Sequence, residues 1–137
     1  MDAAEARRRF AQARVARLGT VREDGAPHLV PFVFALHGHT VYSVVDKKPK
    51  GTTELQRLAN IAVHPRVTAL VDEYEESWDR LWWVRVDGRA RVVREGLDRD
   101  RAVEFLVAKY AQYREEPPIG PAIILDIDRW RWWPSDR

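Results

Sequence analysis

The sequence predicts a small, mainly β domain: a six-stranded antiparallel β-barrel with two or three flanking helices. Six segments have strand composition, and short turns join consecutive ones, which favours antiparallel pairing. Helical patterns are confined to short stretches near the start, in the middle and before the last strand. A chain of 137 residues has room for one core, so residues 1–137 are expected to form a single domain that completes its burial by pairing with a second copy.

The first third of the chain predicts a short helix and a β-hairpin. Good helix formers fill Asp2 to Ala13, and Asp2 is suited to cap the helix. Val15 to Val21 has strand composition and is followed by Asp24-Gly25, a strong hairpin signal. Pro27 to Leu36 is expected to form the second strand. That strand is apolar on both faces, so one face should meet the barrel interior and the other a helix or a partner subunit.

The middle of the chain predicts three further elements. A third strand, Thr40 to Val45, leads into the basic segment that ends at Gly51. Thr53 and Gln56 have capping-box spacing for a short helix, and Asn60 suits its exit. A strand from Val67 to Asp72 should follow.

The last part predicts two long strands around a helix. In the segment from Leu81 to Arg94, apolar and charged residues alternate through Gly88, which indicates a bulge or bend there. Asp98 is expected to cap an amphipathic helix from Arg99 to Tyr113. After a proline-rich connector, Ala122 to Trp133 should form the sixth strand.

Composition excludes several classes of function. The chain has no cysteine, which excludes disulfides, thiolate nucleophiles and cysteine-bound metals. Its 23 basic and 21 acidic residues leave a net charge of +2, which argues against nucleic-acid binding. No apolar run is long enough to span a membrane and no signal peptide is evident, so we expect a cytoplasmic protein. The histidines, including His37 and His39, lack metal-site spacing, so no metal is expected.

The basic segment has the ingredients of a phosphate site. Lys47, Lys48 and Lys50 supply charge, and Gly51 allows close approach of the backbone. The helix that begins near Thr52 would present unpaired amides, with Arg57 on the same side one turn further. A solvated basic surface is the alternative interpretation.

Five of the six tryptophans form two groups, Trp82-Trp83 and Trp130 with Trp132-Trp133. Large aromatic residues at strand ends commonly fill barrel mouths and interfaces. The alternative is that Trp82 or Trp83 stacks against a flat ring or walls a substrate pocket.

The order of motifs resembles a known family. From about Phe10 to Trp133 the chain is similar to the split barrels of the pyridoxamine 5'-phosphate oxidase-like family. More narrowly, it resembles the small actinobacterial branch that uses the deazaflavin coenzyme F-420. The motifs that carry the resemblance are Pro31, the Lys-x-x-Lys of the basic segment, Arg57-Leu58-Ala59-Asn60, His64-Pro65-Arg66-Val67, Val71 to Tyr74, Trp78 and Leu81 to Gly88.

The resemblance implies a split barrel of the FMN-binding type that works as a homodimer, with cofactor sites at the subunit interface. Lys48 and Lys50 match the family's phosphate-binding residues, and Thr52 and Arg57 match less closely. The residues that match the backbone lining the cofactor ring are Val30, Pro31, Val33, Ser43, Val44 and Val45. The arginine and histidine residues that hold substrate phosphate in the oxidases proper have no matching set, which argues against that reaction.

The function implied is an oxidoreductase in which coenzyme F-420 donates hydride to a small organic acceptor. Since the cofactor carries the difficult step, no catalytic residue is predicted. One alternative is an FMN-dependent enzyme on the same fold. The other is a noncatalytic carrier of a flavin, a deazaflavin or haem.

Overall fold

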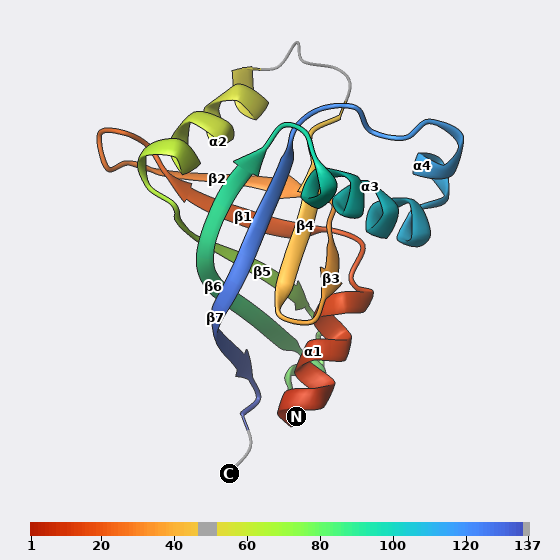
Figure 1. The fold of residues 1–137 in the computed structure, drawn as a ribbon. Coiled ribbons are helices and arrows are strands. Elements are labelled where there is room, and N and C mark those ends of the chain that lie inside the picture. The colour runs from red at the N-terminus through yellow and green to blue at the C-terminus, as the bar shows by residue number, and fades with distance from the viewer. Residues whose placement is uncertain (47–51, 136–137) are drawn as a thin grey trace.

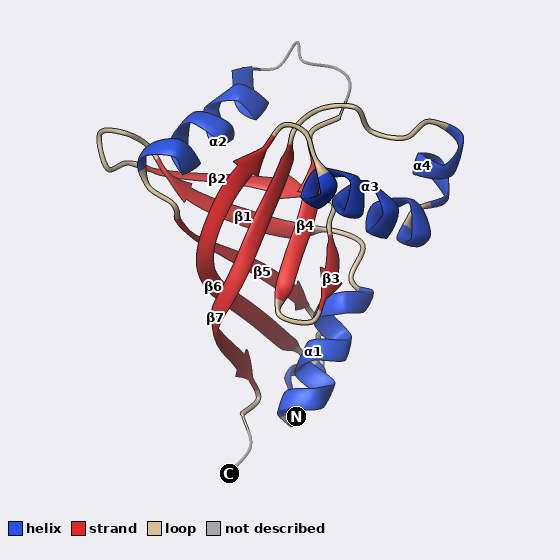
Figure 2. Cartoon of the chain, viewed as in Figure 1, coloured by secondary structure: helices blue, strands red, loops and turns tan. Residues whose placement is uncertain are grey.

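The computed structural model describes residues 1–46 and 52–135. It is a curled antiparallel sheet with helices packed around it (Figures 1 and 2). The helices are α1 (Ala3–Gln12), α2 (Thr52–Val63), the 3-10 turn η1 (Trp78–Arg80), α3 (Leu97–Lys109) and α4 (Ala111–Glu115). The strands are β1 (Ala16–Val21), β2 (Pro27–Phe32), β3 (Ala35–His37), β4 (Thr40–Val44), β5 (Arg66–Glu73), β6 (Trp82–Val93) and β7 (Ala122–Trp133).

The sheet has seven strands, so the prediction of six was wrong. The segment predicted as one strand from Pro27 to Leu36 is divided at Val33 and Phe34 into β2 and β3. β2 pairs only with β1, whereas β3 pairs with β4. The apolar composition continues through the division without change, and for this reason the sequence pattern did not reveal it.

This division closes the sheet. The strand order is β2-β1-β5-β6-β7-β4-β3, so β2 and β3 lie at opposite edges. Only Val33 and Phe34 connect them, and such a link spans at most about 11 Å. The two edges must therefore lie close together, and the sheet curls, with β1 and β2 crossing the direction of β4 and β7 (Figure 1).

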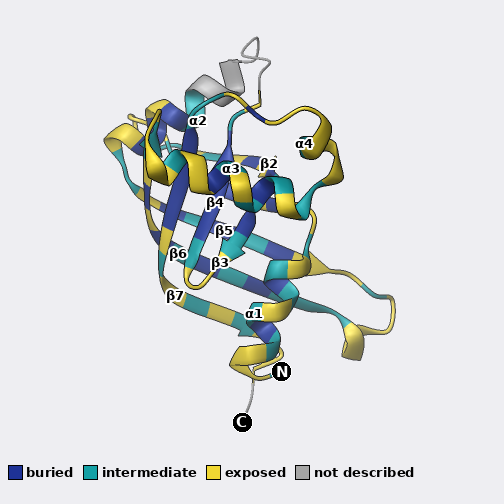
Figure 3. Ribbon diagram, turned by 45° about the vertical axis from the view of Figure 1, so that its right-hand side comes forward, coloured by how far each residue is buried: buried dark blue, intermediate teal, exposed yellow. Residues whose placement is uncertain are grey.

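The core has two parts. The larger one fills the curled sheet and contains the fully buried Phe10, Phe34, Leu18 and Val86. The smaller one lies under α3 and joins Leu106 to residues of β4 and β7 such as Ile124. β4 and β7 are thus covered on both faces near the α3 end, while the outward sides of the helices are exposed (Figure 3).

The strand predicted from Pro27 to Leu36 was expected to be covered on both faces. Val30 and Phe32 of β2 face the core, but Leu29 is 68% exposed on the other side. Within the described chain, no helix covers that side of β2 at Leu29. Coverage by a partner subunit stays a prediction.

α2 is anchored by a buried amide. Asn60, predicted at the helix exit, lies inside α2, which continues to Val63. Its Nδ2 donates to Oγ1 of Thr20 on β1 at 2.9 Å, and its Oδ1 accepts from Nε2 of Gln56 at 2.6 Å. Asn60 therefore fixes the helix to the barrel instead of ending it. The capping role predicted for Thr53 concerns a side chain outside the described part.

α3 begins and ends differently from the prediction. Gly96 precedes it with a φ of 101°, a conformation suited to glycine, and Asp98 lies in the first turn, where it pairs with Arg91. The helix stops at Lys109 because Tyr110 is extended, and α4 follows as a separate turn. The predicted cap at Asp98 and the single helix from Arg99 to Tyr113 were wrong.

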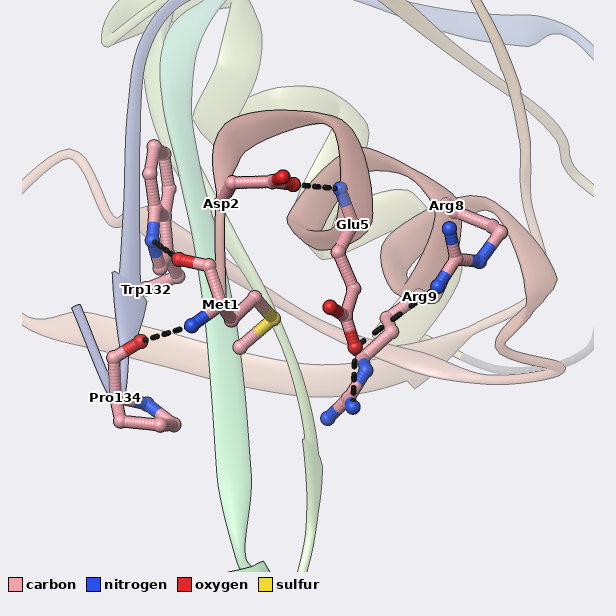
Figure 4. A network of polar contacts seen from close by, with 7 residues as sticks. All are labelled: Met1, Asp2, Glu5, Arg8, Arg9, Trp132 and Pro134. Carbon is pink, nitrogen blue, oxygen red and sulfur yellow. Dashed lines mark hydrogen bonds and ion pairs between the residues drawn. The ribbon is translucent and has the colours of Figure 1, made fainter. Parts of the chain in front are cut away.

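The N-terminal helix closes one end of the barrel. Asp2 caps α1 as predicted, accepting from the Glu5 amide at 2.8 Å, and Phe10 is fully buried. Nε1 of Trp132 donates to the Met1 carbonyl at 3.0 Å, which connects α1 to the end of β7 (Figure 4). Trp132 therefore has a structural role here.

Several local predictions are confirmed. Asp24-Gly25 forms the turn of the β1–β2 hairpin, with Gly25 at a φ of 91°. The pairing of β6 with β7 shifts register between Asp87 and Gly88, as expected for a bulge. β7 has the predicted bounds. No helix in the described residues is long and apolar enough to cross a membrane.

Position 88 requires glycine because β7 lies too close for a side chain, and not because of the backbone conformation. A Cβ atom at this position would overlap the backbone carbonyl of Asp126 on β7. We expect Gly88→Ala to lower the free energy of unfolding by about 2–4 kcal/mol, measured by urea denaturation. In the control Gly19→Ala, the nearest atom is a Thr68 side-chain methyl at 2.9 Å and not a backbone carbonyl, so the loss should be smaller. Equal losses would contradict this account of the bulge.

Candidate functional site

A pocket of about 410 Å³ lies where the two edges of the sheet approach each other. We call it the main pocket. One wall is the end of β2 and the β2–β3 link, and another is the end of β4 with the residues that follow. α2, the α3–α4 junction and Val15 before β1 supply the rest. The lining residues are Val15, Pro31, Phe32, Val33, Ser43, Val44, Val45, Asp46, Arg57, Tyr110, Gln112 and Tyr113.

Six residues predicted from the sequence meet in this pocket. They are Pro31, Val33, Ser43, Val44, Val45 and Arg57. Lys48 and Lys50 lie outside the described residues, as does the side chain of Thr52, but Asp46 and Arg57 on the pocket wall flank that segment in the chain.

Two predicted residues do not line the main pocket. Val30 faces the barrel interior and is 7% exposed. Trp82 lines a different depression at the end of α1, where the Arg9 guanidinium lies 5.1 Å from its ring centroid. In this chain Trp82 therefore packs against an arginine, and a role beside a cofactor stays a prediction.

The pocket floor is backbone held by hydrogen bonds. Ser43 is buried, and its Oγ donates to the Val33 carbonyl across the division between the strands at 2.9 Å. The Val45 amide donates to the Pro121 carbonyl at 2.9 Å, and the Gly120 amide donates to the Val45 carbonyl at 3.1 Å. Both sides of the floor are thus fixed before any ligand binds.

Tyr110, at the α3–α4 junction, forms hydrogen bonds with backbone groups at the division between β2 and β3. The Phe34 amide, which has left the sheet, donates to the Tyr110 hydroxyl at 3.2 Å. That hydroxyl has one proton, and two carbonyl oxygens lie in reach, those of Arg14 at 2.8 Å and Phe34 at 3.0 Å. Burial raises the pKa of Tyr110, so the hydroxyl remains protonated at neutral pH.

Lys109 supports the same turn. Its Nζ donates to the carbonyls of Ala13 at 2.7 Å and Phe34 at 2.9 Å, and lies 3.9 Å from the Phe34 ring centroid. Burial, with a smaller contribution from Arg14, lowers the pKa of Lys109 to about 8. Sequence reasoning missed Lys109 and Tyr110 because the backbone groups that they satisfy appear only once the strand is divided.

The main pocket is chemically simple. Among its described lining residues the ionisable side chains are Asp46, Arg57, Tyr110 and Tyr113, without histidine or cysteine. Two of the four histidines have identified partners: His37 stacks on Phe105 at 4.6 Å between ring centroids, and Nδ1 of His39 accepts from Trp130 Nε1 at 3.2 Å. The pocket is therefore equipped to bind and orient a molecule that brings its own reactivity.

Comparison with known proteins identifies similar folds. The family model described as pyridoxamine 5'-phosphate oxidase matches residues 3–134. No curated protein matches the sequence.

Three solved structures illustrate the similarity in fold. The conserved hypothetical protein Rv2991 from Mycobacterium tuberculosis has a TM-score of 0.78 and 22% identity, over 97% of this chain and 84% of that one. An FAD-binding protein from Mesorhizobium loti has a TM-score of 0.71 and 21% identity, over 96% and 94%. A heme-binding protein from Mycobacterium smegmatis has a TM-score of 0.72 and 22% identity, over 93% of this chain and 52% of that one. At these identities the likeness shows the fold.

Tyr110→Phe tests the hydrogen bonds at the strand division. It removes the acceptor of the Phe34 amide, so we expect the free energy of unfolding to fall by about 1–3 kcal/mol. The control is Tyr74→Phe, whose hydroxyl is on an exposed residue and accepts from Trp78 Nε1 at 3.3 Å. Urea denaturation should show a change under about 0.5 kcal/mol for the control. Equal small changes would mean that Tyr110 does not hold the turn.

The pKa of Lys109 predicts a pH dependence of stability. Its value in the folded protein, about 8, lies below the ordinary value of 10.5, so between these values the unfolded chain binds more protons. The contribution of Lys109 to the free energy of unfolding should therefore increase as the pH rises above about 8. We expect the unmodified protein to gain stability relative to Lys109→Met between pH 8 and about pH 9.5, in parallel urea titrations. A constant difference would contradict the burial of this amine.

Proposed function

The chain belongs to the pyridoxamine 5'-phosphate oxidase family, and from that premise we propose that it is an oxidoreductase in which reduced coenzyme F-420 donates hydride to a small organic acceptor. The observation that carries the proposal is the main pocket at the division between β2 and β3. It brings together six of the residues that the family resemblance assigns to a cofactor site.

The shape and position of the pocket support a flat cofactor with a phosphate. A volume of about 410 Å³ lies within the range of small-molecule sites. Backbone of the β2–β3 link and of β4 would contact the ring. Arg57 and the lysines Lys48 and Lys50, which follow Asp46 in the chain, would neutralise the phosphate.

The chemistry of the pocket also supports hydride transfer. A bound deazaflavin would supply the hydride, and the chain would position it and exclude water. The fixed backbone around Ser43 and Val45 would orient the ring, and the Tyr110–Tyr113 wall would face an acceptor. Hydride transfer of this kind does not need a lining histidine or carboxylate as general base.

Haem is less well suited to this pocket than a flavin or deazaflavin. Haem iron is bound by histidine, cysteine, methionine or tyrosine. The described lining offers only Tyr110 and Tyr113 of these types, and the hydroxyl of Tyr110 already holds the Phe34 turn. FMN remains the chief alternative cofactor, since it presents a phosphate to the same cations.

The exposed side of β2 supports a homodimer. Leu29 is 68% exposed, and Pro31 of the same strand lines the main pocket from an exposed position. A second subunit that covers this face would also help to enclose the pocket. Sedimentation velocity should then give twice the mass of one chain, and a monomer would contradict this part of the proposal.

Cofactor titration tests the proposed function. We expect F-420 to quench tryptophan fluorescence with a dissociation constant on the order of micromolar, tighter than that of FMN. Lys50→Ala and Arg57→Gln should each weaken binding about tenfold, or about 1.4 kcal/mol. The control Arg94→Gln removes the same charge from an exposed turn after β6 and should leave binding unchanged.

Each other outcome contradicts a defined part of the proposal. If FMN binds more tightly than F-420, the proposed cofactor is wrong and FMN takes its place. If neither FMN nor F-420 binds and a haem titration gives a Soret band, the ligand is haem. Oxidation of reduced F-420 with a panel of acceptors, followed by absorbance, then tests catalysis. Tight binding without turnover would indicate a carrier.

A further inference from the structure

A second, cationic depression adjoins the main pocket. It has a volume of about 440 Å³ and shares Val15, Val33, Tyr110 and Gln112 with the main pocket. The residues that it does not share with the main pocket are Arg14, Lys109, Ala111 and Arg114, of which Arg14 also lines the depression beside Trp82. We call it the side pocket. The two pockets therefore lie side by side, with Tyr110 and Gln112 in the lining of both.

The side pocket concentrates positive charge without a carboxylate. Its described lining contains three basic residues and no aspartate or glutamate. The three come from separate places in the chain: Arg14 precedes β1, Lys109 ends α3, and Arg114 belongs to α4. In a chain with nearly balanced charges, such a group of cations is a local feature of the fold.

Backbone carbonyls hold these cations in place without neutralising them. Arg14 Nη1 donates to the Lys109 carbonyl at 2.9 Å, and Arg114 donates from Nε to the Val107 carbonyl at 3.0 Å and from Nη2 to the Ala108 carbonyl at 2.7 Å. A guanidinium has five N–H donors and an ammonium three, so each cation keeps donors beyond its carbonyl bonds. Fixed, charged donors that converge on one depression are well suited to an oxygen anion.

The electrostatics of Lys109 agree with this arrangement. Burial and the charge of Arg14 lower its pKa to about 8. A bound anion would offset both effects, because it favours the charged amine.

We propose that Arg14, Lys109 and Arg114 bind the carboxylate or phosphate group of a small organic acceptor, whose body extends into the main pocket past Tyr110. The role of this anion as part of the acceptor rests on the proposed function. Binding of the anion itself does not, because the three cations Arg14, Lys109 and Arg114 lie outside the predicted cofactor site.

Ligand titration by NMR without cofactor tests the site. The probes are benzoate and phenyl phosphate, with benzamide as the neutral analogue of the same shape. We expect at least one anion to shift the amide signals of residues 110–114 and to bind at least about tenfold more tightly than benzamide. Preference for benzoate or for phenyl phosphate then identifies which group the acceptor carries.

Matched variants locate the binding. Arg14→Gln and Arg114→Gln should each weaken the preferred anion about fivefold or more, while Arg94→Gln should have no effect. The amide spectra of the variants report whether each remains folded. Equal binding of benzamide, shifts elsewhere in the protein, or an equal effect of Arg94→Gln would overturn the proposal.

The outcome is separable from that of the proposed function. If F-420 binds but neither anion does, the side pocket proposal fails and the cofactor assignment stands. If an anion binds but no flavin or deazaflavin does, the anion site stands and its role in holding an acceptor is overturned.

Discussion

The two-residue connection between β2 and β3 is the constraint on which the rest of the structure depends. It joins strands at opposite edges of the sheet, so the sheet must curl until those edges are within about 11 Å. Because Val33 and Phe34 lie between the two strands, their backbone groups lack partners in the sheet. A buried backbone group without a hydrogen bond destabilises the folded protein. Ser43 donates to the Val33 carbonyl, Lys109 donates to the Phe34 carbonyl, and Tyr110 accepts from the Phe34 amide. One constraint thus produces both the main pocket and the α3–α4 wall beside it.

The main pocket has a floor of backbone because it lies at the division between β2 and β3. Because the pocket occupies a division between strands, much of its floor is backbone whose hydrogen bonds are already made to Ser43, Gly120 and Pro121. Such a floor is uncharged, which suits a flat ring system, and the charged side chains among the described lining residues are Asp46 and Arg57. In the proposed function the protein would supply orientation and anion binding, and the bound molecule would supply the reactivity.

The sequence predicted local features well and long-range ones less well. The hairpin at Gly25, the bulge at Gly88 and the bounds of β7 depend on neighbouring residues, and all three were correct. The division of the second strand was missed because its stabilising partner, Tyr110, lies 76 residues away from Phe34. Asn60 was misplaced for the same reason, since its partner Thr20 lies 40 residues away. The family resemblance selected residues that the fold brings together, but the cations of the side pocket had no sequence signal, because they converge only through the α3–α4 junction.

The central claim is that a deazaflavin ring occupies the division between β2 and β3, with its phosphate directed toward the basic segment after Asp46. A crystal structure of the protein with coenzyme F-420 tests this most directly. The account predicts ring density against Val33 and Ser43 to Val45, and phosphate density near Arg57. Density for the ring at another site, such as the depression beside Trp82, would contradict it.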